Sequence, residues 1–350
     1  MFKEAKPLFL ICETPLHVGS GDDLGIIDLP IQRERHTGFP KVESSSLKGS
    51  LRTVFEEKAG EDVNELIKIQ ATFGYDEAGL PKTIEEAFTL GEGDKKELKS
   101  AFVGCLGFTD ARLLLFPVKS MKGVFAWITC PQVLRKFADE MRLCKYHSDK
   151  IKLDSIQNIA ENIAENTVPN SCELLVENKQ NKKQIVLEEF TFEVNHNEQC
   201  DQLANCLANV LFSEEHQYWK EKLRRNLVIL PHDDFRDFVE HSTEVITRTK
   251  IDNETGTVKG GALFTEEFLP TDSILYSLVL ASSIAPMFLN EKKFVNSGYF
   301  SEFSQESAVI GYFKCALDNI KNIFQLGGNA TLGKGIVRMI FLNNEENKEE

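Results

Sequence analysis

The segment between residues 8 and 52 constrains the fold most, because a buried strand, a glycine- and aspartate-rich loop and a helix follow one another within it. Leu8–Cys12 is a continuous apolar run, which is typical of a buried strand. Leu47–Lys58 has apolar residues at helical spacing, and the serines directly before it indicate where the helix starts. The chain must therefore place a polar loop between a buried strand and a helix start.

The start of this helix is a candidate phosphate-binding site. Backbone N–H groups without helical partners and the positive end of the helix dipole favour an anion there. Lys48 and Arg52 lie four residues apart on one helix face and add positive charge. Alternatively, the serines only cap the helix and the loop is a plain turn. Together, the acidic loop and the helix start suggest a polynucleotide held near a carboxylate.

The remaining periodicity predicts an α+β chain. Strands are expected at 107–118, 123–130, 185–194, 273–280 and 336–342, and helices at 132–143, 201–212, 233–239 and 309–324. Residues 244–270 alternate around the turn-rich sequence Asp252–Gly256, which predicts an exposed hairpin. The order of the strong elements resembles a split βαβ, or ferredoxin-like, core with large insertions.

Composition limits the partners and the compartment. The 350 residues carry a net charge of −14, which argues against nucleic-acid binding over the whole surface. Basic residues nevertheless gather at 33–52 and 310–340, as a basic groove on an acidic body would require. Eight cysteines without a Cys-x-x-Cys pair indicate reduced cytoplasmic thiols rather than a zinc or redox site. No apolar run reaches the roughly 18–20 residues that a membrane span needs.

A second loop, Gly327–Gly335, nearly matches the phosphate-binding loop of ATPases. Gly335 stands where that loop needs Ser or Thr to hold magnesium. The predicted order of helix, loop and strand is also the reverse of the strand and helix that flank a P-loop. An ATPase is therefore not expected, although the glycines allow close approach to a phosphate chain. The alternative is a plain connection between a helix and a strand.

Several segments together resemble the RAMP superfamily, and more narrowly the repeated backbone subunit of type III-B (Cmr) CRISPR effectors. The most specific segments are His17–Gly21, Gly25–Pro40 with its Ile-Asp-Leu-Pro core, and Ser45–Gly49. The segments Gly107–Arg112, Asp252–Val258 and Thr331–Gly335 also look like that subunit. The resemblance extends from end to end, with gaps in two polar insertions. One departure is Glu43-Ser44, where the superfamily often has small residues.

The resemblance implies a modified ferredoxin-like (RRM-like) palm with a β-hairpin thumb and helical insertions. It implies that copies of the chain stack head to tail along a CRISPR guide RNA, beside other type III-B effector subunits and away from any membrane. Each thumb would kink the duplex of guide and complementary target RNA. The implied function is guide binding and cleavage of the target RNA at regular intervals, beside each kink, in the cytoplasm.

The resemblance also implies roles for individual residues. By its position in Ile-Asp-Leu-Pro, the catalytic aspartate is Asp28. Residues expected to bind RNA, from the resemblance and from local charge, are Arg33, Arg35, Ser45, Ser46, Lys48, Gly49, Arg52, Gly327, Gly328, Thr331, Gly333 and Lys334. Residues expected on the thumb are Arg248, Lys250, Asp252 and Thr257.

The expected reaction is transesterification, in which the RNA 2′-OH attacks its own phosphate and no protein nucleophile is needed. An exposed aspartate is a weak base at pH 7, since its ordinary pKa is about 3.9. Asp28 is therefore expected to bind Mg²⁺ or Mn²⁺, whose bound water could serve as the base. Asp22 and Asp23 of the same loop either share the metal or are turn residues.

Three further polar residues have two interpretations each. His17 is a candidate for catalytic support, but orienting the loop or touching guide RNA is the favoured interpretation. His36, which lies between two arginine-rich flanks, has the same two interpretations as His17. Asp110 is either a second carboxylate near the site or a strand-end residue paired with Arg112.

The expected division of the chain follows from these assignments. Residues 1–60 form the first part of the palm with the catalytic loop and helix start, 61–105 a peripheral helical insertion, 106–143 a palm hairpin and helix, 144–235 a variable insertion, 236–270 the thumb hairpin, 271–342 the rest of the palm with the glycine-rich loop, and 343–350 a disordered acidic tail. Two alternative functions are a non-catalytic RNA-binding scaffold and a RAMP endoribonuclease that processes CRISPR RNA precursors.

Overall fold

The computed structural model describes residues 2–22, 25–75, 102–144, 156, 161, 166–259, 263–284 and 302–343. Its strands are β1 (Glu4–Cys12), β2 (Lys41–Val42), β3 (Gly74–Tyr75), β4 (Phe102–Val103), β5 (Leu106–Phe108), β6 (Ala111–Lys119), β7 (Phe125–Thr129), β8 (Thr167–Val168), β9 (Val176–Glu177), β10 (Lys183–Leu187), β11 (Phe190–Glu193), β12 (Asn195–His196), β13 (Leu227–Ile229), β14 (Glu244–Arg248), β15 (Phe264–Phe268), β16 (Ile274–Ala281), β17 (Ile323–Gln325) and β18 (Ile336–Phe341). Its helices are α1 (Ser44–Ala59), α2 (Val63–Phe73), α5 (Pro131–Leu143), α7 (Glu198–Leu211), α8 (Gln217–Asn226), α9 (His232–His241) and α11 (Glu306–Asn319).

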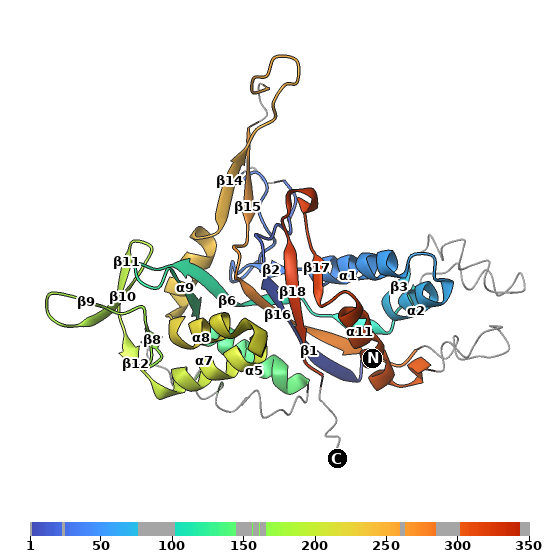
Figure 1. Ribbon diagram of the computed structural model, residues 1–350, viewed down its shortest axis with the longest axis horizontal. Coiled ribbons are helices and arrows are strands. Elements are labelled where there is room, and N and C mark those ends of the chain that lie inside the picture. The colour runs from blue at the N-terminus through green and yellow to red at the C-terminus, as the bar shows by residue number, and fades with distance from the viewer. Residues whose placement is uncertain are drawn as a thin grey trace, which may run out of the picture.

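Most of the strands join one mixed sheet. Its order is β12-β8-β13-β7-β6-β16-β1-β18-β17, with β2 paired to β6 and β5 to β16. Within the central group of strands, each neighbouring pair is antiparallel: β6 with β16, β16 with β1, and β1 with β18. Two outer pairs are parallel, β13 with β7 and β12 with β8. The expectation of a fold that mixes helices with a central sheet is confirmed. A separate hairpin of β14 and β15 projects from this body (Figure 1).

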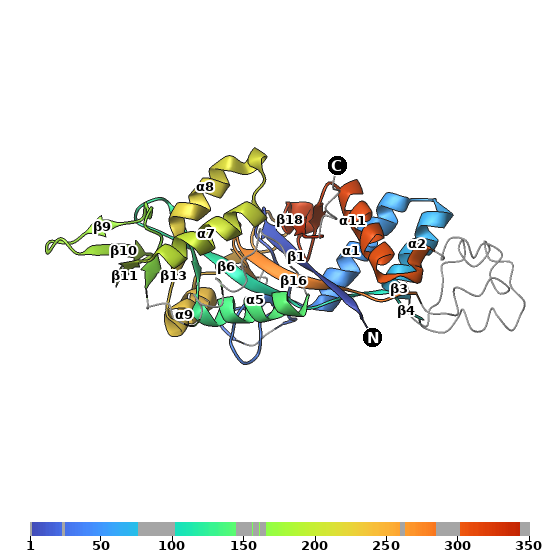
Figure 2. The same ribbon diagram turned by 90° about the horizontal axis from the view of Figure 1, so that it is seen from below.

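Helices pack on both faces of the central strands. Phe137 of α5 packs on Phe9 of β1, with ring centroids 5.9 Å apart. Leu8 is the neighbour of Phe9 along the strand, so it faces the opposite side of the sheet, and it pairs in register with Phe341. On that side Phe313 of α11 packs 5.2 Å from Phe341. Helices α1 and α2 lie beside α11, whereas α7 and α8 cover the other end of the sheet (Figure 2).

The sequence predictions are confirmed for the first strand, the first helix, the β6–β7 hairpin, α5, α7, α9, β16 and β18. Two segments that were each predicted as one strand are divided into two strands in the structure. The strand predicted at 185–194 is the hairpin β10–β11, because Glu188 has a left-handed φ of 50° and the chain reverses there. The strand predicted at 107–118 is divided into β5 and β6 by Thr109 and Asp110.

The helix predicted at 309–324 is too long. It ends at Asn319, because Lys321 and Asn322 both have a φ of 57°, which a helix cannot contain. Strand β17 follows and pairs antiparallel with β18. The glycine-rich loop therefore joins two antiparallel strands, and the predicted connection from a helix to a strand is wrong.

The elements that were not predicted include α8, β13 and several two-residue strands. Helix α8 has the sequence QYWKEKLRRN, in which charged residues outnumber apolar ones and leave little periodicity to detect. Residues 344–350 of the acidic tail, residues 76–101 of the first predicted insertion and most of residues 145–165 of the second lie outside the described residues. Across the part of the chain that the structure describes, no helix combines the length and apolar character needed to cross a bilayer.

Candidate functional site

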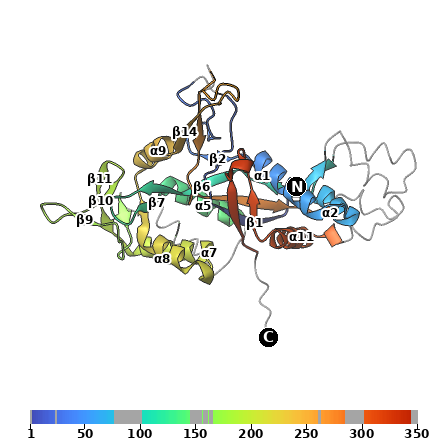
Figure 3. The same cartoon turned by 45° about the horizontal axis from the view of Figure 1, so that its top comes forward.

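The segment Glu13–Pro40, here called the first loop, lies beside the β14–β15 hairpin (Figure 3) and also contacts the loop that joins β17 to β18. Leu29 forms a parallel bridge with Glu266 of β15. From the other side, the Gly328 N–H donates a hydrogen bond of 2.8 Å to the His17 carbonyl. The first loop thus brings the N-terminal segment, the hairpin and the glycine-rich loop together at one place.

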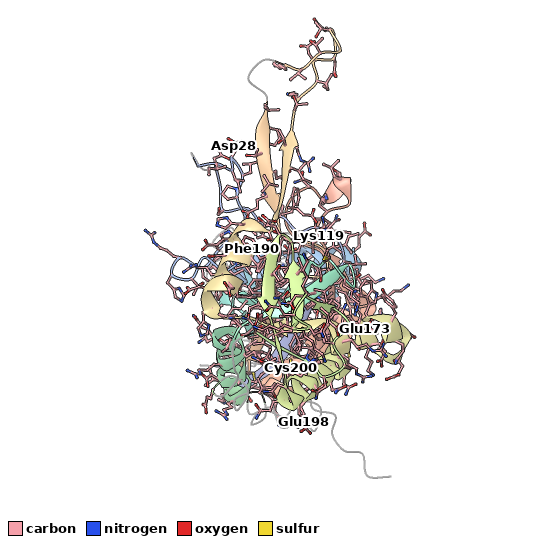
Figure 4. All side chains as sticks on the ribbon, turned by 90° about the vertical axis from the view of Figure 1, so that its left-hand side faces the viewer. Asp28, Lys119, Glu173, Phe190, Glu198 and Cys200 are labelled. Atoms are coloured by element: carbon pink, nitrogen blue, oxygen red, sulfur yellow. The ribbon has the colours of Figure 1, made fainter. Side chains whose placement is uncertain are left out.

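Asp28 is exposed on the first loop and bound to one residue of the hairpin (Figure 4). Its Oδ2 accepts hydrogen bonds from the Thr265 N–H at 2.7 Å and from the Thr265 hydroxyl at 2.8 Å. The Asp28 N–H in turn donates to the Thr265 hydroxyl at 2.9 Å. The Thr265 N–H, followed by its hydroxyl, lowers the pKa of Asp28 below its ordinary value. The carboxylate is therefore ionised at neutral pH, which suits a metal ligand better than a general base.

His17 is buried against the base of the hairpin. Its Nδ1 lies 2.7 Å from the Glu267 carbonyl oxygen, and its Nε2 lies 3.8 Å from a carboxylate oxygen of Glu266. The ring centroid is 5.5 Å from that of Phe268. Both ring nitrogens face groups of the chain itself, so the placement is that of a residue that orients the first loop. Catalytic support by His17 stays a prediction.

Two buried glutamates of β15 were not predicted as part of the site. Glu266 is 4% exposed and forms an ion pair with Arg248 of β14 at 2.6 Å. The Asn329 amide of the glycine-rich loop also donates to its carboxylate. The sequence predicts an exposed hairpin because charges crowd both arms, but at its base these charges are paired and buried.

Glu267 is 1% exposed and holds the first loop. One of its oxygens accepts from Arg33 at 2.5 Å, and the other accepts from the Ile31 N–H at 3.0 Å. Arg33 also donates to the carbonyl oxygens of Gly38 and Val239. The guanidinium of this predicted RNA-binding residue is therefore used to fix the loop.

The start of α1 already has an anion, which is the carboxylate of Asp110. The Ser44 N–H donates to Asp110 at 2.9 Å, and Lys41 donates to the other oxygen at 2.8 Å. Burial acts to raise the pKa of Asp110, but the bonds from Lys41 and Ser44 outweigh it and lower the pKa. Glu43, and not a serine, is the N-cap residue. The helix start is therefore less available to a phosphate than the sequence suggests.

Arg112 was considered as the partner of Asp110, and this pairing is wrong. Arg112 forms its ion pair with Glu34 of the first loop and approaches Glu140 of α5 at 3.4 Å. His36 lines the neighbouring cavity of about 290 Å³ together with Arg112 and Tyr276. His36 thus lies apart from the residues that contact Asp28.

The two cations on α1 contact the chain itself. Lys48 donates to the Leu106 carbonyl at 2.9 Å, and burial, with the nearby Arg52 charge, lowers the pKa of Lys48. Arg52 pairs with Glu56 at 2.8 Å and donates to the Gly74 carbonyl at 3.0 Å. These groups would have to exchange such contacts to bind RNA.

Other residues predicted to bind RNA lie at the surface. Arg35, Ser45, Gly49, Gly327, Thr331 and Gly333 are exposed, and Ser46 and Gly328 are partly exposed. Within the described ranges no side-chain bond of Arg35 is present, so its guanidinium is available. Lys334 lies 5.0 Å above the ring of Phe268 at the base of the hairpin.

Two glycines of the glycine-rich loop have different structural roles. Gly327 has a φ of +81°, and a Cβ there would lie 2.2 Å from the His17 carbonyl oxygen. Gly333 also has a positive φ of 71°, but a Cβ there would meet nothing within 4 Å. Gly327 is therefore required by the first loop itself, whereas Gly333 is required by the turn.

Three of the four predicted thumb residues lie on the distal part of the hairpin, where Lys250 and Thr257 are exposed and Asp252 is partly exposed. Ile251 and Val258 bridge the two arms near the tip. Asp252 Oδ1 accepts from the N–H groups of Glu254 and Thr255, both at 3.0 Å, and these bonds lower the pKa of Asp252. Lys250 and Thr257 beside it are exposed, whereas Arg248 belongs to the buried base.

The residues present fit a divalent cation only in part. No group of three or more His, Cys, Asp or Glu side chains arranged to hold a metal occurs among the residues that the structure describes. Asp28 offers one carboxylate oxygen, and Asp22 is exposed on the same loop, while Asp23 lies outside the described residues. Mg²⁺ commonly keeps several waters and binds through one or two carboxylates plus substrate phosphates. Asp28 fits such a site, which the RNA would complete.

Comparison with known proteins gives one consistent family. The model of the RAMP superfamily matches residues 9–338. The CRISPR system Cmr endoribonuclease Cmr4 of Pyrococcus furiosus is 34% identical over 332 residues, covering 93% of this chain and 92% of that protein.

Solved structures agree with this result. The crystal structure of oligomeric Cmr4 from Pyrococcus furiosus has a TM-score of 0.60 at 27% identity and covers 97% of this chain and 98% of that one. A chain in the cryo-EM structure of the type III-B Cmr-beta complex bound to cognate target RNA has a TM-score of 0.68 at 22% identity, with the same coverage. The second likeness supports the fold alone.

Proposed function

The chain belongs to the RAMP superfamily, and from this membership we propose that it is a backbone subunit of a type III-B CRISPR effector that cleaves target RNA. It binds CRISPR guide RNA, further copies of itself and other subunits of the effector, and it acts in the cytoplasm. The observation that carries the proposal is the position of Asp28. An exposed, ionised carboxylate is held by hydrogen bonds against the base of a projecting hairpin.

Strand order supports a ferredoxin-like palm. The chain runs from β1 through α1 to β6, and from β16 through α11 to β18. These four strands lie in the order β6-β16-β1-β18 with antiparallel neighbours, which is the arrangement of a split βαβ unit. The β14–β15 hairpin is then the thumb. Because Asp28 contacts β15, each copy places its carboxylate where its own thumb meets the palm.

The chemistry is RNA transesterification. The 2′-OH attacks the adjacent phosphorus, a bond forms from O2′ to phosphorus, and the bond to O5′ breaks, so the products end in a 2′,3′-cyclic phosphate and a 5′-OH. The protein must align the attacking and leaving oxygens and counter the developing charge. A Mg²⁺ or Mn²⁺ ion bound by Asp28 would supply positive charge and a bound water of lowered pKa.

The RNA backbone is expected to contact the exposed groups around this carboxylate. Arg35 lies on the first loop itself. Gln32 of that loop donates to the Ser46 hydroxyl at 3.3 Å, and the glycine-rich loop that carries Thr331–Lys334 contacts it through Gly328 and His17. A chain with a net charge of −14 needs such local sites, because its surface as a whole repels phosphate. These contacts hold the backbone and leave the bases to the guide.

The test uses the effector complex reconstituted with guide RNA and a labelled complementary RNA. Asp28→Ala should abolish cleavage while leaving target binding within about twofold of wild type, because it removes the reacting site without altering the RNA-binding groups. Asp139→Ala removes an exposed aspartate of α5, outside the first loop, and is the control that should leave both cleavage and binding unchanged. Cleavage should require Mg²⁺ or Mn²⁺ and give evenly spaced products.

Each alternative function predicts a different result. Tight target binding without cleavage by the wild type would leave the chain as a non-catalytic scaffold. Cleavage by the isolated chain in the presence of a chelator would indicate a processing endoribonuclease instead. Equal cleavage by wild type and Asp28→Ala would remove Asp28 from the mechanism.

A further inference from the structure

We propose that Thr265 is a positioning residue for the Asp28 carboxylate, and this inference rests on the proposed function. Thr265 lies in β15, 237 positions along the chain from Asp28. Its hydroxyl accepts from the Asp28 N–H at 2.9 Å and donates to Asp28 Oδ2 at 2.8 Å. One hydroxyl has one proton to give and lone pairs to accept with, so both bonds form together. The pair closes a small ring between the first loop and the hairpin.

This ring decides which carboxylate oxygen is free. Oδ2 accepts from both the N–H and the hydroxyl of Thr265. Within the ranges that the structure describes, no other residue donates a hydrogen bond to Oδ1. An exposed aspartate on a loop otherwise samples several rotamers. The two bonds to Oδ2 restrict that sampling and leave Oδ1 as the oxygen available to a cation or to the RNA.

The contact also makes Asp28 move with the hairpin. The Leu29 N–H donates to the Thr265 carbonyl at 3.0 Å, and the Glu267 N–H donates to the Leu29 carbonyl at 3.0 Å. These bonds continue the Asp28 contact as a short parallel ladder along β15. A displacement of the hairpin by bound RNA is therefore passed to the carboxylate. Thr265 is the side chain that makes this link to the carboxylate itself.

The chain provides a matched control. Thr247 of β14 is the register partner of Thr265 across the hairpin, and it is exposed. Thr247→Val therefore removes a hydroxyl from the same rung of the ladder without touching Asp28. Thr265→Val keeps the β-branched shape and the backbone N–H but loses the hydroxyl. Thr265→Ser keeps the hydroxyl.

The experiment measures single-turnover cleavage at saturating target RNA, together with target affinity, in the reconstituted complex with Mg²⁺. Thr265→Val should cleave about 10–100-fold more slowly with unchanged affinity, because a small displacement of a catalytic group has such an effect. Thr265→Ser and Thr247→Val should stay within about threefold of wild type.

The outcomes separate this inference from the proposed function. Wild-type cleavage that survives Asp28→Ala, or no cleavage by wild type, overturns the proposed function. If Asp28→Ala is inactive but Thr265→Val cleaves at the wild-type rate, only the positioning role is overturned. The positioning role also fails if Thr265→Val loses target affinity in proportion to its rate, or if Thr247→Val or Thr265→Ser is equally slow.

Discussion

Among single residues, Asp272 gives the clearest expectation for pH dependence. It is partly buried in the turn between β15 and β16, and its burial, with the charge of Glu13 nearby, raises its pKa to about 6 despite Lys222 and Arg338. The folded state then binds more protons than the unfolded state between the ordinary pKa of 3.8 and about 6. The stability that this group contributes therefore falls as pH rises through that window.

Asp272→Asn should remove this dependence. Asn tolerates the left-handed φ of 67° at this position, so the turn is kept. The variant should gain about 1 kcal/mol in the free energy of unfolding at about pH 7.5, after allowance for solvent screening, and nothing at about pH 4. Urea denaturation at both pH values measures the difference. A gain of the same size at both would show that the charge of Asp272 is not its cause.

The sequence identifies some residues of the site and not others for a physical reason. Asp28 is found because it lies within a contiguous motif. Thr265 and Glu267 are not, because their importance comes from contacts with the first loop, more than 230 positions away in the chain. The contacts of Arg33 and Lys48 could not be predicted for the same reason, since charge in a sequence does not reveal that a buried carboxylate or a carbonyl already binds it. RNA binding by these two residues stays a prediction.

At the scale of elements, Glu266 fastens the hairpin to the palm and the glycine-rich loop. Its buried carboxylate pairs with Arg248 and accepts from Asn329. Glu266→Gln leaves Arg248 with an uncompensated charge, so the free energy of unfolding should fall by about 2–4 kcal/mol. Glu254→Gln at the exposed hairpin tip is the control and should change it by less than about 0.5 kcal/mol. Chemical denaturation measures both, and equal small losses would contradict the fastening role.

Elements with one apolar face were predictable, and those defined by local backbone reversal were not. Helices α5 and α7 each bury a regular stripe, which periodicity detects. The sequence after Asn319 continues the helical spacing of α11 with apolar residues, although two left-handed residues end the helix. Without a glycine or proline at this point, the sequence carries no turn signal strong enough to outweigh the spacing.

At the scale of the whole molecule, the arrangement of charge indicates whether the protein contacts the phosphates or the base edges of RNA. The groups expected to bind RNA near Asp28 lie on loops and at a helix start, which are positions suited to phosphates rather than to base edges. Two arginines near Asp28, Arg33 and Arg248, are paired with buried carboxylates. Under the proposed function, sequence recognition is expected to come from base pairing with the guide.

Exchanging the guide should therefore redirect cleavage completely. With a new guide, the complex should cut the RNA complementary to it and spare the former target, with the same spacing of cuts, because the spacing is set by the stacked protein copies. Arg35→Ala should weaken binding to both targets by the same factor, since it removes a phosphate contact. Cleavage assays with two guides and two targets in all pairings measure this. A protein variant that changed the preferred target under a fixed guide would show that side chains read bases directly.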